Sequence, residues 1–184
     1  MVMTEPTYLS NQFLIAMPTL ADPNFFQTVT YISEHNANGA LGLVINRPLD
    51  LSLGQLLEHL QIATERFDLA TRPVYLGGPV QPEQGFVLHS PVGRWGATLR
   101  VTEQIGITTS RDILQAVARG EGPGQILVTL GYAGWGPGVI RSRADRRPTG
   151  RARGAPRRPR AIFRPAANGR RPGGGTRGAA RTRR

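Results

Sequence analysis

Between residues 12 and 138, short runs of apolar residues alternate with turn-forming residues. The runs are rich in β-branched and aromatic side chains, and glycine, proline or asparagine bounds most of them, as is typical of β-strands. Two of the runs flank Asn36–Gly39, where asparagine and glycine tolerate positive φ, so the sequence predicts a β-hairpin there. The predicted strands are residues 13–17, 28–32, 41–45, 74–76, 86–88, 98–101 and 126–130.

Two segments change to a helical period. The first has four leucines at positions i, i+3, i+4 and i+7, starting at Leu53, which form one apolar stripe. At its start, Ser52 and Gln55 have the spacing of a capping box. The second is expected to begin at Ser110 or Thr109 and to end at Gly120 in the left-handed conformation. Because strands outnumber helices and do not alternate regularly with them, the sequence predicts an α+β fold.

Charge divides the chain into two unequal parts. Residues 1–140 carry seven Arg and eleven Asp or Glu, a net charge of −4, whereas residues 141–184 carry sixteen Arg and one Asp, a net charge of +15. The acidic part repels phosphate and has no helix-turn-helix spacing, so nucleic acid is expected to bind only non-specifically, through the basic part. Residues 139–184 are mostly Arg, Ala, Gly and Pro, and we expect them to form a disordered tail.

The composition also excludes several kinds of chemistry. Without cysteine there is no disulfide, thiolate nucleophile or cysteine zinc site, and without lysine there is no Schiff base or Walker-type phosphate loop. The three histidines lack metal-ligand spacing, and no catalytic motif can be read from residue order, so we expect no metal, no cofactor and no catalytic residue. No segment is apolar and long enough for a signal peptide or a membrane span, which predicts a cytoplasmic protein with no membrane contact.

Four polar residues at predicted strand ends are the first candidates for ligand binding. Glu34 and His35 end one strand, and His35 can either bind or transfer a proton or simply stabilise the turn. Asn46 and Arg47 follow the next strand, where the Arg47 fork can clamp a carboxylate or a phosphate. The alternative is that Asn46 caps the loop while Arg47 pairs with an acid such as Glu34. We expect a groove near these four residues to bind a small anion or a protein partner.

Four more residues complete the candidate set. Gly77 and Gly78 follow a predicted strand, where their amides can approach a ligand closely or form a tight turn. His89 stands at another strand end, where, like His35, it can either bind or transfer a proton or simply stabilise the turn. Trp135 lies in a glycine-rich turn that lacks the G-x-G-x-x-G order, and it can either pack in the core or stack on a ligand.

Three long blocks carry a family resemblance: "TVTYISEHNANGALGLVINRP", "VYLGGPVQPEQGFVLHSP" and "ILVTLGYAGWGPG". Over about residues 10–138 the chain closely resembles the bacterial AlgH/YqgE family. The resemblance implies one compact domain, residues 1–138, with a bifurcated mixed β-sheet that forms a pseudo-barrel and helices packed outside it. One member's name associates the family with transcriptional control of alginate production, and no enzymatic activity is established for the family.

The resemblance therefore implies a non-catalytic regulatory or interaction protein, with transcriptional regulation as one role. The alternative function is a hydrolase acting on a small acidic metabolite. That enzyme needs His35 or His89 within hydrogen-bond reach of a carboxylate in one pocket.

Two positions depart from the family pattern. Ser33 stands where many relatives have cysteine, which excludes a thiol-based role here. Relatives continue from "GWGPG" into an acidic amphipathic helix, whereas this chain continues "VIRSRADRR". Because the residues that follow have GC-rich codons, we hypothesise a reading-frame shift near the Gly138 codon, the alternative being a genuine arginine-rich tail. The nucleotide sequence after that codon distinguishes the two.

Overall fold

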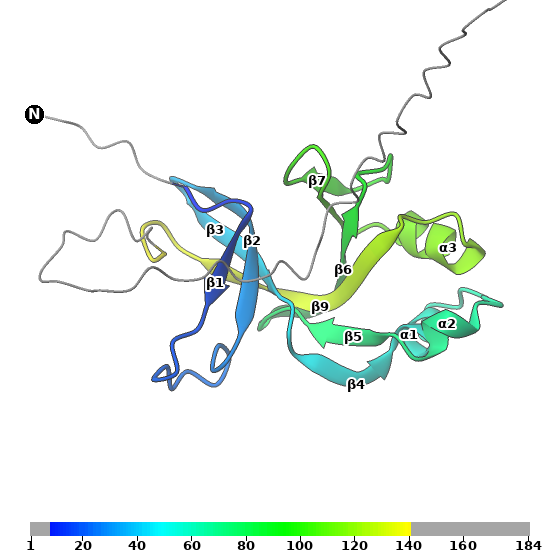
Figure 1. Ribbon diagram of the computed structural model, residues 1–184, viewed down its shortest axis with the longest axis horizontal. Coiled ribbons are helices and arrows are strands. Elements are labelled where there is room, and N and C mark those ends of the chain that lie inside the picture. The colour runs from blue at the N-terminus through cyan, green and yellow to red at the C-terminus, as the bar shows by residue number, and fades with distance from the viewer. Residues whose placement is uncertain (1–7, 141–184) are drawn as a thin grey trace, which may run out of the picture.

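The computed structural model describes residues 8–140, which form one curled nine-stranded sheet and three helices (Figure 1). The main path through the sheet is β1-β2-β3-β9-β6-β8-β7, and β4 and β5 form a branch beside it. The strands are β1 (Gln12–Ile15), β2 (Val29–Asn36), β3 (Gly39–Val44), β4 (Pro48–Ser52), β5 (Pro73–Leu76), β6 (Val80–Ser90), β7 (Thr98–Arg100), β8 (Gly106–Thr108) and β9 (Gln125–Trp135). The helices are α1 (Leu53–His59), α2 (Phe67–Ala70) and α3 (Arg111–Arg119).

The sheet divides along β9. One edge of this strand pairs with β6 over residues 125–130, and the other edge pairs with β3 over residues 133–135 and with β5 at Thr129 and Leu130. The β5–β9 pair is parallel and the others are antiparallel, so the sheet is both bifurcated and mixed. It curls into a half-barrel with the few helices outside it, which confirms the predicted α+β fold (Figure 1).

Two apolar cores hold these elements together. The larger core joins the helices to the sheet, and the smaller core fills the curl of the sheet between β2, β3, β6 and β8. The leucine stripe of α1 contributes Leu53 and Leu57 to the larger core, as its helical period predicts. The other fully buried side chains of the larger core include Leu69, Val74 and Ile113.

The predicted hairpin is confirmed between β2 and β3. Asn36 pairs with Gly39, so only two residues form the turn. Gly39 has a φ of +138°, and a Cβ on it would lie 2.2 Å from the Trp135 carbonyl oxygen on β9. A glycine is therefore needed here both for the backbone conformation and for the close approach of a neighbouring strand.

The ends of the two predicted helices follow the sequence in most respects. Ser52 and Gln55 form the capping box, with the Gln55 N–H donating to the Ser52 hydroxyl at 3.2 Å and the Ser52 N–H to the Gln55 amide oxygen at 2.9 Å. Helix α3 begins after Ser110 and ends at Gly120 with a φ of 81°. The expected side-chain cap at Ser110 is wrong, because its hydroxyl donates to the Asp112 carboxylate instead of accepting a helix N–H.

Three elements were not expected from the sequence: β4, β8 and α2. Strand β8 has three residues and α2 has four, so neither is long enough to display a period. Strand β4 reads as a proline-led loop and becomes a strand by pairing with β5. The predicted strand 13–17 ends earlier than expected, at Ile15. Of the predicted tail, Val139 is exposed and Ile140 is buried, and residues 141–184 lie outside the described part of the chain.

A β5–β9 cleft as the candidate functional site

Asn46 and Arg47 hold the loop that precedes β2. The Asn46 amide accepts the Val29 N–H at 2.8 Å and donates to the Gln27 carbonyl at 2.9 Å. The Arg47 guanidinium donates to the carbonyl oxygens of the same loop, at 2.9 Å to Pro23, 3.0 Å to Asn24 and 3.0 Å to Phe26. These hydrogen bonds occupy guanidinium N–H groups with which Arg47 would otherwise bind an anion.

Glu34 and His35 lie at the other end of β2. The Glu34 carboxylate accepts a hydrogen bond from the Asn36 amide at 2.8 Å and is exposed. The His35 ring accepts the Leu9 N–H at Nδ1 at 2.9 Å, and the Tyr8 ring packs edge-on against it with the centroids 5.5 Å apart. His35 therefore anchors the segment that leads into β1, in keeping with the structural alternative for this residue.

The structure does not bring these four candidates into one groove. Asn46 bonds Val29 at the start of β2, six residues before His35, and a strand rises about 3.3 Å per residue, so the two pairs lie roughly 20 Å apart. The suggested pairing of Arg47 with Glu34 is wrong, because Arg47 makes its hydrogen bonds to carbonyl oxygens and takes part in neither ion pair of the described residues.

Gly77 and Gly78 are buried against β9. The Gly77 N–H donates to the Leu130 carbonyl at 2.7 Å, and its own carbonyl accepts the Val44 N–H at 2.8 Å. A Cβ on Gly77 would lie 2.2 Å from the Gly131 carbonyl oxygen, and one on Gly78 would lie 2.2 Å from the Tyr132 carbonyl carbon. These glycines allow two backbones to approach each other, and strand contacts fill the space that a phosphate would need.

His89 is fully buried, at 0% exposure, between β6 and β8. Its Nδ1 lies 3.1 Å from the Pro91 carbonyl oxygen and its Nε2 lies 2.9 Å from the Thr108 hydroxyl, which in turn lies 2.6 Å from the Thr98 hydroxyl. Burial lowers the pKa of the imidazole, and the hydrogen bond to the Pro91 carbonyl partly opposes that shift. The ring is therefore held neutral and away from solvent.

Trp135 packs against the loop before β2 and is half-buried. Its ring centroid lies 5.5 Å from that of Phe25, at an interplanar angle of 33°. Because its backbone pairs with Ala40 on β3, the strand fixes its position. These contacts favour the packing alternative over ligand stacking.

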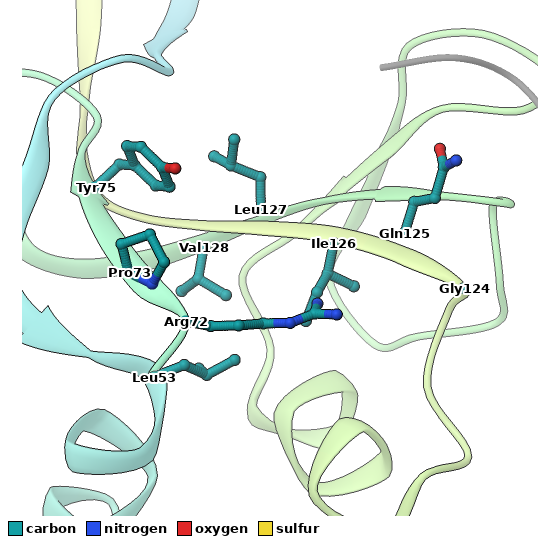
Figure 2. Close-up of a pocket in the computed structure, with 9 residues that line it drawn as sticks. All are labelled: Leu53, Arg72, Pro73, Tyr75, Gly124, Gln125, Ile126, Leu127 and Val128. Atoms are coloured by element: carbon teal, nitrogen blue, oxygen red, sulfur yellow. The ribbon is translucent and has the colours of Figure 1, made fainter. Parts of the chain in front are cut away.

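A hollow that combines a positive charge with apolar and polar side chains lies where β5 and β9 diverge (Figure 2). It has a volume of about 370 Å³. Its wall combines apolar side chains from α1, β5 and β9 with three side chains that carry polar groups, Arg72, Tyr75 and Gln125. We call it the β5–β9 cleft; its lining residues are Leu53, Arg72, Pro73, Tyr75, Gly124, Gln125, Ile126, Leu127 and Val128.

Arg72 supplies the positive charge of this cleft. Figure 2 shows its side chain extended from the start of β5 across the opening toward β9. The Arg72 carbonyl accepts the Leu53 N–H at 2.7 Å, which ties the start of α1 to the start of β5. Within residues 8–140, no hydrogen bond or ion pair engages the guanidinium. An unpaired guanidinium beside an apolar wall is a binding group for a carboxylate or a phosphate.

A smaller polar hollow of about 170 Å³ adjoins the cleft and shares Arg72, Gly124 and Ile126 with it. Its second arginine, Arg66, is engaged, because it donates to both carboxylate oxygens of Asp68, at 3.0 and 2.6 Å. The hydrogen bond from Arg66 lowers the pKa of Asp68, and the charges of Arg66 and Arg72 lower it further. Within residues 8–140, Arg72 therefore interacts with Asp68 through its charge but, unlike Arg66, makes no hydrogen bond or ion pair with its guanidinium.

Residue order gave no signal for Arg72. It precedes a proline and reads as a solvated loop arginine, and the cleft exists only because strands from distant parts of the chain diverge. Among the described residues there is no cluster of three or more histidines, aspartates or glutamates that could hold a metal ion. None of the described helices is long and apolar enough to span a membrane.

A family model described as AlgH-like matches residues 13–146, more than half of the chain. The chain belongs to the AlgH-like family. A UPF0301 protein from Nitrosococcus oceani is 57% identical over 133 residues, which cover 72% of this chain and 71% of the relative. A UPF0301 protein from Thioalkalivibrio sulfidiphilus is 58% identical over 138 residues, covering 75% of this chain and 74% of the relative.

The solution structure of the AlgH protein from Pseudomonas aeruginosa is also similar. It is 50% identical with a TM-score of 0.61, over 74% of this chain and 72% of that protein. The crystal structure of protein DIP2367 from Corynebacterium diphtheriae, at 18% identity and a TM-score of 0.54, shares the fold. The AlgH-like chain thus has the fold of its family, a family whose function is not established.

Proposed function

We propose that this AlgH-like chain is a non-catalytic, cytoplasmic interaction protein that binds an acidic partner in the β5–β9 cleft and acts in regulation through that partner. The observation that carries the proposal is the Arg72 guanidinium, which makes no hydrogen bond or ion pair within residues 8–140 and extends across a cleft of about 370 Å³ with apolar and polar walls. A cleft of this size is within the range of natural ligand sites.

The side chains of the cleft support binding rather than catalysis. Tyr75 brings the one hydroxyl of its lining, and the lining has no histidine, aspartate or glutamate that could activate it as a general base. Arginine stays protonated throughout the physiological range and can neutralise a carboxylate but cannot act as a general base. The cleft therefore offers a charge and an apolar wall.

The alternative function, a hydrolase, has less support. It needs a histidine beside a carboxylate, but the His35 ring accepts a backbone N–H and the His89 ring contacts a carbonyl and a hydroxyl. Nucleic-acid binding through the arginines of residues 141–184 concerns a part of the chain outside the described residues. Any role in transcription is therefore proposed to work through a protein or metabolite partner, because residues 1–140 carry a net charge of −4.

Hexanoate is a suitable first probe because it combines one carboxylate with an alkyl chain. We expect hexanoate to shift the amide NMR signals of Ile126 and Val128 in the ¹⁵N-labelled full chain, with millimolar affinity. Replacing Arg72 with glutamine should weaken this binding about tenfold or more, because a charge-assisted hydrogen bond is lost.

The matched control is Arg100→Gln, which removes an exposed arginine on β7, remote from the cleft lining. It should leave hexanoate binding unchanged. Equal binding by the parent chain and the Arg72→Gln variant would overturn the proposal, and shifts confined to the arginines of residues 141–184 would do the same.

A further inference from the structure

One edge of β9 is paired over only part of its length. Residues 125–130 all pair with β6 on one side. On the other side, within residues 8–140, β5 pairs only at Thr129 and Leu130, and β3 joins from residue 133 onward. Among the residues that the structure describes, residues 125–128 therefore have a ladder partner on one side only, and their other side faces the β5–β9 cleft (Figure 2).

The backbone groups on this open edge can be assigned from one hydrogen bond. The Gly77 N–H donates to the Leu130 carbonyl, so the Leu130 backbone groups point toward β5. Successive strand residues direct these groups to opposite edges, and the β6–β9 register has no shift from residue 125 to 130. Val128 and Ile126 therefore also point their N–H and carbonyl groups toward this edge. The Tyr75–Thr129 pairing uses the Val128 carbonyl as the acceptor of the Tyr75 N–H, so the open groups are the Val128 N–H and both backbone groups of Ile126.

We propose that the open edge of β9 at residues 125–128 binds an acidic peptide segment in extended conformation, which adds to the sheet as a strand and places a carboxylate on Arg72. This inference rests on the proposed function, because it names the partner of the same cleft. Strand addition is an established way for a sheet edge to recognise a peptide, with main-chain hydrogen bonds supplying affinity.

The cleft supplies the other features that such a peptide needs. Pro73 is exposed and Ile126 half-buried in its lining, so both offer apolar surface to the alternate side chains that an extended segment directs to one face. Arg72 provides the charge complementarity that favours an acidic over a neutral segment. Four open residues correspond to about 13 Å of strand, which four or five peptide residues would cover.

The experiment uses an acetylated and amidated pentapeptide of sequence TVEVT with the ¹⁵N-labelled full chain. Two further peptides carry N-methyl groups, one on both valine amides and the other on the glutamate and last threonine amides. Alternate amides of a bound strand point to opposite edges, so one methylated peptide should bind at least about tenfold more weakly than the parent and the other within about twofold. Bound parent peptide should also slow hydrogen exchange at the Ile126 amide.

The protein variants separate this inference from the proposed function. Arg72→Gln should weaken the binding of the parent peptide, whereas Arg100→Gln should leave it unchanged. If all three peptides bind equally well and Arg72→Gln still weakens their binding, strand addition is wrong and the acidic-partner site stands. If hexanoate binds in an Arg72-dependent way and no peptide does, the peptide proposal falls alone. If no probe binds in an Arg72-dependent way, both proposals fall.

Discussion

The Nε2 atom of His89 lies 2.9 Å from the hydroxyl of Thr108, and neither residue is exposed to solvent. The Pro91 carbonyl accepts the proton of Nδ1, so Nε2 is the acceptor and Thr108 the donor. The Thr108 oxygen can then accept the hydroxyl proton of Thr98 at 2.6 Å. A second proton on the ring would reverse this chain, with Nε2 donating to Thr108, Thr108 to Thr98 and Thr98 to the Trp95 carbonyl at 3.2 Å. The charge on the ring would still be buried away from water, and this burial is what opposes protonation.

This arrangement predicts that the AlgH-like chain loses stability as the pH falls. Above about pH 6.5, the ordinary pKa of histidine, His89 is neutral in both the folded and the unfolded chain. Because burial lowers the pKa in the folded chain, only the unfolded chain takes up a proton as the pH falls from 6.5 toward the lowered pKa. Urea unfolding between pH 5 and 7.5 measures this loss in the free energy of unfolding. The loss should be smaller in the His89→Gln variant and unchanged in the His59→Gln variant, which alters an exposed histidine. Equal slopes in all three chains would contradict the assignment.

Replacing Gly77 with alanine should destabilise the fold by about 2–4 kcal/mol. The new Cβ would lie 2.2 Å from the Gly131 carbonyl oxygen and 2.7 Å from the Thr129 hydroxyl, so the junction of β5 and β9 would have to open. Gly85→Ala is the matched control, because no atom lies within 4 Å of its Cβ position. Thermal or urea unfolding of both variants measures the difference. A Gly77→Ala chain as stable as Gly85→Ala would show that the two strands separate freely.

The fold was largely predictable because most of its strands display a signal within their own residues. Apolar runs of three to five residues marked seven of the nine strands, and the capping residues marked the start of α1. Strands β4 and β8 carry no such signal, since they are stabilised by partners distant in sequence. Strand β4, for example, pairs with β5 across two helices.

The site was less predictable, for a physical reason that Arg47 and Arg72 illustrate together. Both arginines flank predicted strands, and residue type and spacing do not distinguish them. Arg47 makes its hydrogen bonds to carbonyl oxygens more than twenty residues away in sequence. The Arg72 guanidinium makes no hydrogen bond or ion pair within residues 8–140 and extends across a cleft. Which arginine is engaged depends on loop geometry, and the sequence does not encode that geometry locally.

Arg47 should therefore act as a structural residue. Replacing it with glutamine removes three hydrogen bonds from a charged donor, and we expect a loss of about 2–3 kcal/mol in the free energy of unfolding. Hydrogen exchange at the amides of residues 23–27 should accelerate, and Arg47→Lys should not restore it, because a lysine has no planar fork. Arg100→Gln is the control on an exposed arginine. If Arg47→Gln proves fully stable, the residue is free to bind an anion as the sequence suggested.

The capping box of α1 should influence the cleft as well as the helix. Ser52→Ala removes the acceptor of the Gln55 N–H, which costs about 1 kcal/mol at a helix N-terminus. Because Leu53 starts α1, lines the cleft and donates its N–H to the Arg72 carbonyl, fraying of this turn should also displace Arg72 and weaken hexanoate binding. Urea unfolding of Ser52→Ala, Gln55→Ala and the double variant measures the coupling, which should be less than additive since the two side chains act as one unit. Strictly additive losses with unchanged hexanoate affinity would show that the cap and the cleft are independent.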